Sequence, residues 1–161
     1  MGWGQRAGGR RYRVDGEGSR EKLRGGRGGV GEKGRALGLQ FGSWGEPEMI
    51  SVNSRLYEAH PDYAMVIPGK PHSEGRNQRI LDLTRREVQD FVIEEMSRVF
   101  SSADISYVKW DMNRIFSDYY SAALEPERQG EVAHRYVLGL YRCLKELTER
   151  FPHILFEGCA G

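Results

Sequence analysis

Apolar residues recur along the chain with two different spacings, and together these predict alternating helices and strands. Helical spacing runs from about residue 84 to 103 and from about residue 126 to 150. Short apolar runs, which predict strands, lie at 37–42, 79–83, 105–110 and 154–157. This alternation is typical of an α/β domain with a parallel sheet.

The ends of these elements carry recognisable signals. Gly38 predicts the C-terminal cap of a helix that precedes the first strand. Thr84 and Glu87 have the spacing of a capping box at the start of the next helix. Residues 53–78 are rich in turn formers, so we expect a long loop there, and long loops in compact domains are often functional.

The first 29 residues differ in composition from the rest. Most of the chain's 21 glycines lie in residues 1–38 and no apolar periodicity crosses residues 1–29, so this Gly/Arg-rich segment is expected to be disordered or unrelated to the domain of residues 30–161. Gly26 to Gly31 fit the dinucleotide-binding G-x-G-x-x-G pattern, but no apolar strand precedes them. Two Arg-Gly-Gly units at 24–29 leave a nucleic-acid-binding tail as an alternative.

The bulk properties exclude several classes of protein. A chain of 161 residues with 39% hydrophobic content and a net charge of +1 is long enough for one soluble domain. No apolar run approaches the roughly 18 residues of a membrane helix, and no secretory leader is visible, so we expect a cytoplasmic protein. The two cysteines and four dispersed histidines lack the spacing of a metal site, and we expect neither metal nor cofactor.

Polar side chains gather where the predicted strands end. Lys109, Asp111 and Asn113 alternate with Trp110 and Met112, so the first three share one face as far as the strand extends. Ligands in parallel α/β folds bind at the carboxyl ends of strands. Further candidates at other strand ends are Trp44, Glu46, Glu48, Glu157 and Cys159. A structural ion pair between Lys109 and Asp111 is the alternative.

Six stretches resemble, in the same order, the catalytic barrel of the glycoside hydrolase family 36 α-galactosidases over roughly residues 30–161. They are FGSWGEPEM, SEGRNQ, LDLTRREV, SYVKWDMNR, ERQGEVAHRYVLGLY and FPHILFEGCAG. The resemblance implies a partial (β/α)₈ TIM barrel, approximately its third to fifth βα units. It also implies a homo-oligomeric parent enzyme that removes terminal α-linked galactose from oligosaccharides of the raffinose and melibiose class by a retaining double displacement.

The resemblance assigns roles to individual residues. Asp111 is similar to the catalytic nucleophile, and Lys109 to a donor to sugar hydroxyls whose charge keeps Asp111 ionised. The other positions implied to bind substrate are Trp44, Arg76, Asn113, Cys159 and Gly161. Structural alternatives remain: Trp44 in the core, Cys159 as a small buried residue, and Arg76 paired with Glu74.

The chain also departs from the family pattern. The acid/base carboxylate that a retaining glycosidase needs is expected beyond Gly161, so the chain is interpreted as an incomplete fragment that is inactive alone. Gly45 replaces a bulky aromatic residue, and Gly34 replaces an apolar residue of a helix. A non-catalytic remnant with weak sugar binding, or a nucleic-acid binder with an Arg-Gly-Gly tail, is the alternative.

Overall fold

The computed structural model describes residues 26–160, which form an α/β arrangement of helices and short strands. Its elements are α1 Gly26–Ala36, β1 Phe41–Gly45, β2 Met49–Ile50, α2 Arg55–Ala59, the 3₁₀ turn η2 Pro61–Tyr63, β3 Arg79–Ile80, α3 Arg86–Phe100, β4 Ile105–Met112, the 3₁₀ turn η3 Pro126–Glu131, α4 Val132–Arg150 and β5 Leu155–Ala160.

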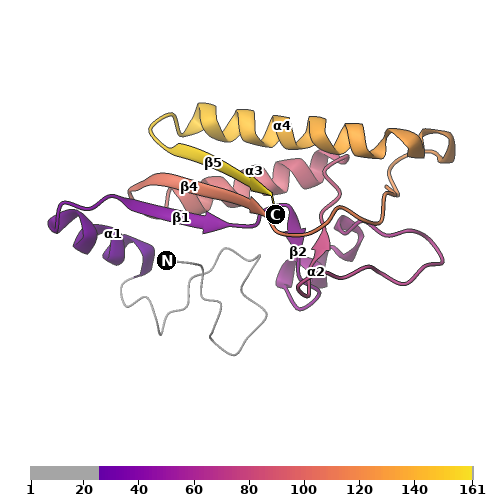
Figure 1. Cartoon of the computed structure of the whole chain (residues 1–161), viewed down its shortest axis with the longest axis horizontal. Helices are drawn as coiled ribbons and strands as arrows, with labels where there is room; N and C mark the ends of the chain where they lie inside the picture. Colours follow the sequence, from indigo (N-terminus) through magenta and orange to yellow (C-terminus); the bar gives the residue numbers. More distant parts are fainter. Residues whose placement is uncertain (1–25, 161) are drawn as a thin grey trace.

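The main sheet has three parallel strands in the order β1-β4-β5. The helices α3 and α4 connect successive strands and pack against each other (Figure 1). All three strands point toward β2, α2 and the long loop, so their carboxyl ends meet that loop region (Figure 1). The predicted α/β alternation with a parallel sheet is therefore present.

The core lies between the sheet and the two long helices. It includes Val92 and Val99 of α3, Val108 of β4, and Cys143 and Leu147 of α4, all buried. Burial of such side chains is the main source of stability, at about 1.5–3 kcal/mol for each fully buried large aliphatic residue.

A glycine lets α4 approach the start of α3 closely. A Cβ atom added at Gly139 would lie 1.9 Å from the Leu83 carbonyl oxygen and 2.8 Å from Gln89 Nε2. That carbonyl accepts a hydrogen bond of 2.8 Å from Gln89 Nε2. No other amino acid fits at residue 139 unless the backbone moves.

The first strand begins later than predicted. Gly38 has φ +73°, Leu39 N–H donates to the Gly34 carbonyl (2.9 Å), and Gly38 N–H donates to the Arg35 carbonyl (2.8 Å). This is the Schellman pattern, so the predicted cap at Gly38 is confirmed. The same cap occupies the beginning of the predicted strand 37–42, which is why β1 starts at Phe41.

The run 79–83 does not join the parallel sheet. Only Arg79 and Ile80 form a strand, and this strand pairs antiparallel with β2. The predicted capping box is also wrong: Thr84 donates its hydroxyl to Asp82 Oδ1 (2.6 Å), and α3 begins after Arg85 without a side-chain cap. The buried Asp82 carboxylate holds the Thr84 hydroxyl away from the helix start.

Helix α1 begins inside the segment that we expected to lack structure. Residues 26–29 are helical, and Gly31 packs on the Phe41 ring, 3.8 Å from where its Cβ would lie. A glycine-rich turn allows this contact because no side chain separates the helix from β1. The six residues of the G-x-G-x-x-G match lie within α1. Residues 1–25 and Gly161 lie outside the described part of the chain.

Candidate functional site

The parallel register gathers candidate residues from all three strands at one end of the sheet. Trp44 of β1 pairs with Lys109 of β4, and Asp111 of β4 pairs with Cys159 of β5. Adjacent parallel strands place such partners side by side, about 4.8 Å apart. The register therefore brings Trp44, Lys109, Asp111 and Cys159 together.

Asp111 is held on one side only. The residue is buried, with 5% of its surface exposed. Oδ2 accepts hydrogen bonds from Trp44 Nε1 (2.7 Å) and Asn113 Nδ2 (2.5 Å). Oδ1 is buried and has no hydrogen-bond partner among residues 26–160. One oxygen is therefore fixed by two donors, and the other is buried without a hydrogen bond from residues 26–160.

The surroundings of Asp111 favour its charged form. Burial opposes ionisation, but hydrogen bonds from Asn113 and Trp44, the nearby Cys159 thiol and the positive charge of Lys109 outweigh it. The pKa of Asp111 is consequently lowered from its ordinary value. The group is thus a carboxylate at neutral pH, as nucleophilic or electrostatic chemistry requires.

Lys109 forms its ion pair with the neighbouring strand. Its Nζ lies 3.7 Å from Glu157 Oε1, and Glu157 also accepts a short hydrogen bond from the Tyr107 hydroxyl. Lys109 therefore forms its ion pair with Glu157 and not with Asp111, the alternative raised from sequence. Because the Lys109 side chain is about one third exposed, it remains accessible to a polar ligand.

A second carboxylate, Glu46, links the loops to β4. The amide nitrogen of Asn113 donates to Glu46 Oε1 (3.0 Å) as well as to Asp111. Gln78 Nε2 donates to Glu46 Oε2 (3.3 Å), and Arg76 Nη1 lies 3.4 Å from Glu46 Oε1. Asn113 therefore bridges two carboxylates with its amide hydrogens.

Arg76 sits at the tip of a tight turn. Gly75 and Gln78 exchange backbone hydrogen bonds of 3.2 and 2.9 Å, while Arg76 and Asn77 have φ of 56° and 60°. This is the geometry of a type I′ turn, which is unusual for arginine. Arg76 pairs with Glu46 rather than with Glu74, the alternative raised from sequence.

Sequence reasoning missed the residues that hold this turn in place. Arg114, which is 7% exposed, donates to the backbone carbonyls of Gln78 (3.1 Å) and Ser73. Asp118 accepts from the backbone N–H and hydroxyl of Ser73, both at 3.1 Å. The only sequence signal for this role was that Arg114 directly follows the polar residues at the end of β4.

The opposite face of β4 is structural. Trp110 Nε1 donates to Glu48 Oε1 (2.8 Å), and the Tyr136 hydroxyl donates to Glu48 Oε2 (2.7 Å). Burial raises the pKa of Glu48, although both hydrogen bonds act against the increase. Trp110 thus lies away from Asp111, as strand alternation predicts, and only Trp44 of these two tryptophans belongs to the site.

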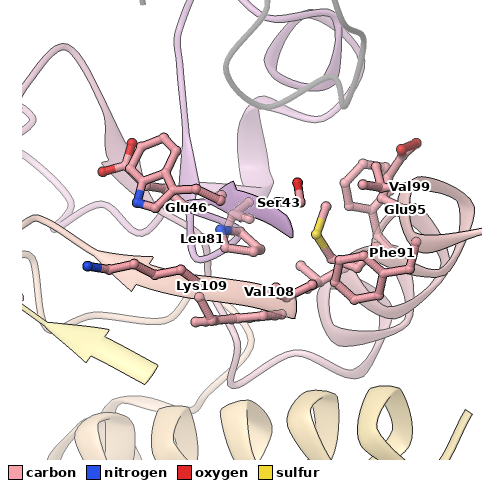
Figure 2. Close-up of a pocket in the computed structure, with 15 residues that line it drawn as sticks. Ser43, Glu46, Leu81, Phe91, Glu95, Val99, Val108 and Lys109 are labelled. Carbon is pink, nitrogen blue, oxygen red and sulfur yellow. The ribbon is translucent and has the colours of Figure 1, made fainter. Parts of the chain in front are cut away.

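A pocket opens next to this cluster, between the sheet and α3. Figure 2 shows Glu46 and Lys109 at one end, and Phe91, Glu95 and Val99 of α3 at the other. Its α3 end is mainly apolar, and Asp111 is not among its lining residues. The pocket therefore touches the polar cluster without containing its central carboxylate.

Residues 26–160 contain neither a metal-binding cluster nor a membrane-spanning helix. No group of three or more histidine, cysteine or acidic side chains is placed to hold a metal ion there. None of the helices in the same residues has the length and apolar character needed to cross a membrane. Gly161, the remaining predicted site residue, lies outside the described residues.

Fold and site together define a parallel α/β segment with an ionised carboxylate at the carboxyl ends of its strands, as in (β/α)-barrel hydrolases. The chain belongs to the Melibiase family, whose model matches residues 2–161. This match extends through residues 2–29, which we expected to be disordered or unrelated.

Similar proteins are α-galactosidases. The chain is 55% identical over 161 residues to α-galactosidase AgaA of Geobacillus stearothermophilus, covering 99% of this chain and 22% of that protein. It is 59% identical over 124 residues to α-galactosidase 1 of Pediococcus pentosaceus, covering 77% of this chain and 17% of that protein. The chain thus spans about a fifth of the length of these relatives.

The structure is similar to the corresponding part of solved enzymes. A variant of GH36 α-galactosidase AgaA in complex with 1-deoxygalactonojirimycin superposes with a TM-score of 0.91 at 55% identity, over 94% of this chain and 21% of that one. A Lactobacillus brevis α-galactosidase gives 0.87 at 39% identity, over 91% of this chain and 20% of that one.

Proposed function

We propose that this chain forms part of the catalytic barrel of an α-galactosidase and that Asp111 is its nucleophile. The observation that carries the proposal is the asymmetry of the Asp111 carboxylate: Oδ2 is held by two donors while Oδ1 has no partner within residues 26–160. A retaining glycosidase needs an ionised, oriented carboxylate of this kind beside the sugar. Family membership supports the same role.

In the proposed reaction, Asp111 Oδ1 attacks the anomeric carbon of a terminal α-galactoside. A bond forms between this oxygen and the sugar, and the glycosidic bond breaks as an acid/base group protonates the leaving oxygen. Water, deprotonated by that same group, then releases galactose and regenerates the Asp111 carboxylate. The Trp44 and Asn113 hydrogen bonds keep Oδ2 in place during both steps.

The remaining residues are proposed to bind the sugar. Lys109 and Arg76 offer cationic donors to hydroxyl groups, and Trp44 an aromatic wall. Asn113 uses both amide hydrogens on carboxylates, so its carbonyl oxygen is left to accept from a hydroxyl. Cys159 and Gly161 are proposed to lie near the 2-hydroxyl.

The proposed substrates are oligosaccharides with a terminal α-linked galactose, of the raffinose and melibiose class. AgaA variants have been crystallised with raffinose and with stachyose. We further propose that the segment supplies approximately the third to fifth units of a (β/α)₈ barrel, and that the parent enzyme is a cytoplasmic homo-oligomer.

The acid/base is proposed to come from outside residues 26–160. Glu46 is engaged by Asn113, Gln78 and Arg76. Glu48 is engaged by Trp110 and Tyr136, and Glu157 by Lys109 and Tyr107. Because each of the three already has partners among the described residues, we do not assign the acid/base role to any of them. We therefore expect this chain alone to bind and react with an activated sugar, but not to turn over raffinose.

A non-catalytic sugar-binding role is the second candidate, and the engagement of these carboxylates favours it. Under this alternative the ligand contacts would be retained, but no bond to Asp111 would form. The two candidates therefore agree on binding and differ on covalent chemistry.

Binding of 1-deoxygalactonojirimycin, measured by titration calorimetry, tests the site that both candidates share. This iminosugar is cationic at neutral pH, so it should pair with the Asp111 carboxylate. Asp111→Asn should weaken binding by about ten- to a hundredfold, the equivalent of about 1.5–3 kcal/mol for a charged hydrogen bond. Glu48→Gln, on the other face of β4, is the matched control. Equal affinity of Asp111→Asn and the unmodified chain would overturn the proposal.

A further inference from the structure

We propose that Arg114 is a positioning residue: together with Asp118, it holds the Gly75–Gln78 turn so that Arg76 lies over Glu46 beside Asp111. The part of this inference that concerns sugar recognition rests on the function proposed above. The clamp itself rests only on contacts within the described residues.

Arg114 makes its contacts with backbone oxygen atoms from three places in the chain. Nε donates to the Gln78 carbonyl (3.1 Å), Nη1 to the Ile115 carbonyl (3.1 Å), and Nη2 to the Ser73 carbonyl. The guanidinium is almost completely buried, with its side chain 4% exposed. A planar fork of donors is needed to reach these carbonyls together, and only arginine carries one.

Asp118 completes the clamp from the same loop. Its carboxylate lies 4.0 Å from Arg114 Nη2 and accepts both the backbone N–H and the hydroxyl of Ser73. Asp118 has φ +55°, a left-handed backbone conformation that aspartate adopts more readily than most residues. The two ends of the Ser73–Gln78 stretch are therefore tied to residues that follow Asn113.

The turn is packed against Arg114 as well as hydrogen-bonded to it. A Cβ atom at Gly75 would lie 3.1 Å from Arg114 Cγ, so the arginine stem runs directly beneath the turn. Arg76 at the tip has φ +56°, a conformation that an arginine rarely adopts without support from its surroundings. The clamp supplies that support.

Without the clamp, little else fixes Arg76. Its side chain is 41% exposed, and its ion pair is a single 3.4 Å contact with Glu46. Such a half-exposed pair holds a long side chain only weakly. Arg114, in contrast, follows Asp111 by three residues on the same chain segment. The position of Arg76 relative to Asp111 is therefore set by the end of β4.

The test compares Arg114→Lys with the unmodified chain in three measurements. The first is the ¹⁵N relaxation of the Arg76 Nε–H group, which reports side-chain order. The second is the affinity for 1-deoxygalactonojirimycin. The third is the pH titration of the Trp44 indole N–H signal, which follows the ionisation of Asp111 through their hydrogen bond.

The Arg114→Lys comparison includes a matched control and a second variant. Arg85 also ties a loop carbonyl and a carboxylate, those of Asp62, with a 15% exposed side chain, and Arg85→Lys should leave Arg76 unchanged. Asp118→Asn keeps the size of the side chain and removes its charge next to Arg114. This milder variant decides the question if Arg114→Lys does not fold.

We expect Arg114→Lys to lower the order of Arg76 Nε–H and to weaken probe binding about tenfold, while the Trp44 titration midpoint stays the same. The unchanged midpoint separates loss of Arg76 from damage to the Asp111 region. The titratable groups around Asp111 are Lys109 on its own strand, Cys159 on β5 and Glu46, which shares the Asn113 amide with it. Unchanged order of Arg76 in both variants, or lost order with unchanged binding, would overturn the inference. If the unmodified chain binds no probe but Arg114→Lys releases Arg76, the proposed function fails and the clamp stands.

Discussion

Replacing Trp44 with phenylalanine isolates the hydrogen bond that holds the central carboxylate. The substitution keeps an aromatic ring in β1 but removes the Nε1–H that donates to Asp111 Oδ2 at 2.7 Å. A hydrogen bond to a charged group contributes about 1.5–3 kcal/mol, and one pKa unit corresponds to about 1.36 kcal/mol. The pKa of Asp111 should therefore rise in Trp44→Phe, because the lost hydrogen bond favoured the charged form.

The direction of this shift follows from the balance at the site. Burial raises the pKa of Asp111, and its donors together with the Lys109 charge bring it below the ordinary value. Without the Trp44 donor, less remains to counteract the effect of burial, so the pKa of Asp111 rises. A lowered pKa adds stability above the pKa of the unfolded chain, and this stability is lost as the pH falls through the folded value. Trp44→Phe should reduce that contribution.

The assay is a pH titration of the Asp111 carboxyl ¹³C signal by NMR. Trp110→Phe is the control, because Trp110 donates to Glu48 on the other face of β4 and should leave the Asp111 midpoint unchanged. An Asp111 midpoint that is the same in Trp44→Phe and the unmodified chain, or lower in the variant, would refute the reasoning.

Two further predictions concern packing and thiol chemistry. Gly139→Ala should destabilise the chain by about 3 kcal/mol in urea unfolding, because its Cβ would overlap the Leu83 carbonyl. Gly130→Ala is the control, because residue 130 faces open space and its unfolding midpoint should change little. Equal unfolding midpoints for the two variants would contradict the close approach of α4. Burial raises the pKa of the Cys143 thiol to about 12, so iodoacetamide at about pH 8 should modify the partly exposed Cys159 and spare Cys143 until urea is added. Modification of Cys143 in the folded chain, located by peptide mass spectrometry, would show that this part of the core opens.

Local patterns predicted the parts of the site that lie within one strand. The alternation of Lys109, Asp111 and Asn113 gave the shared face, and it also placed Trp110 on the opposite side, where the structure has it bonded to Glu48. These results follow from the period of two in any strand. Because β4 runs without interruption from Ile105 to Met112, the alternation fixes which face of the sheet each of its side chains occupies.

Contacts between distant segments were not predictable in the same way. The Arg76–Glu46 pair joins a turn to a loop 30 residues earlier, and only the folded chain shows that Gln78 and Asn113 meet at the same carboxylate. Asp82 is a local example of the same limit. The sequence predicted that the Thr84 hydroxyl caps the helix, but in the structure this hydroxyl donates to the buried Asp82 carboxylate.

The measurement that tests the central claim most directly is covalent labelling of Asp111. A 2-deoxy-2-fluoro-galactosyl fluoride has a leaving group that needs no protonation, so the nucleophile can react without an acid/base. The anomeric carbon–fluorine bond breaks, fluoride leaves, and an ester forms with Asp111 Oδ1. We predict a single adduct on the peptide that contains Asp111, absent from Asp111→Asn and unaffected by Glu48→Gln. An intact, folded chain that binds 1-deoxygalactonojirimycin but gains no adduct, or gains it on another residue, would contradict the assignment of Asp111 as the nucleophile.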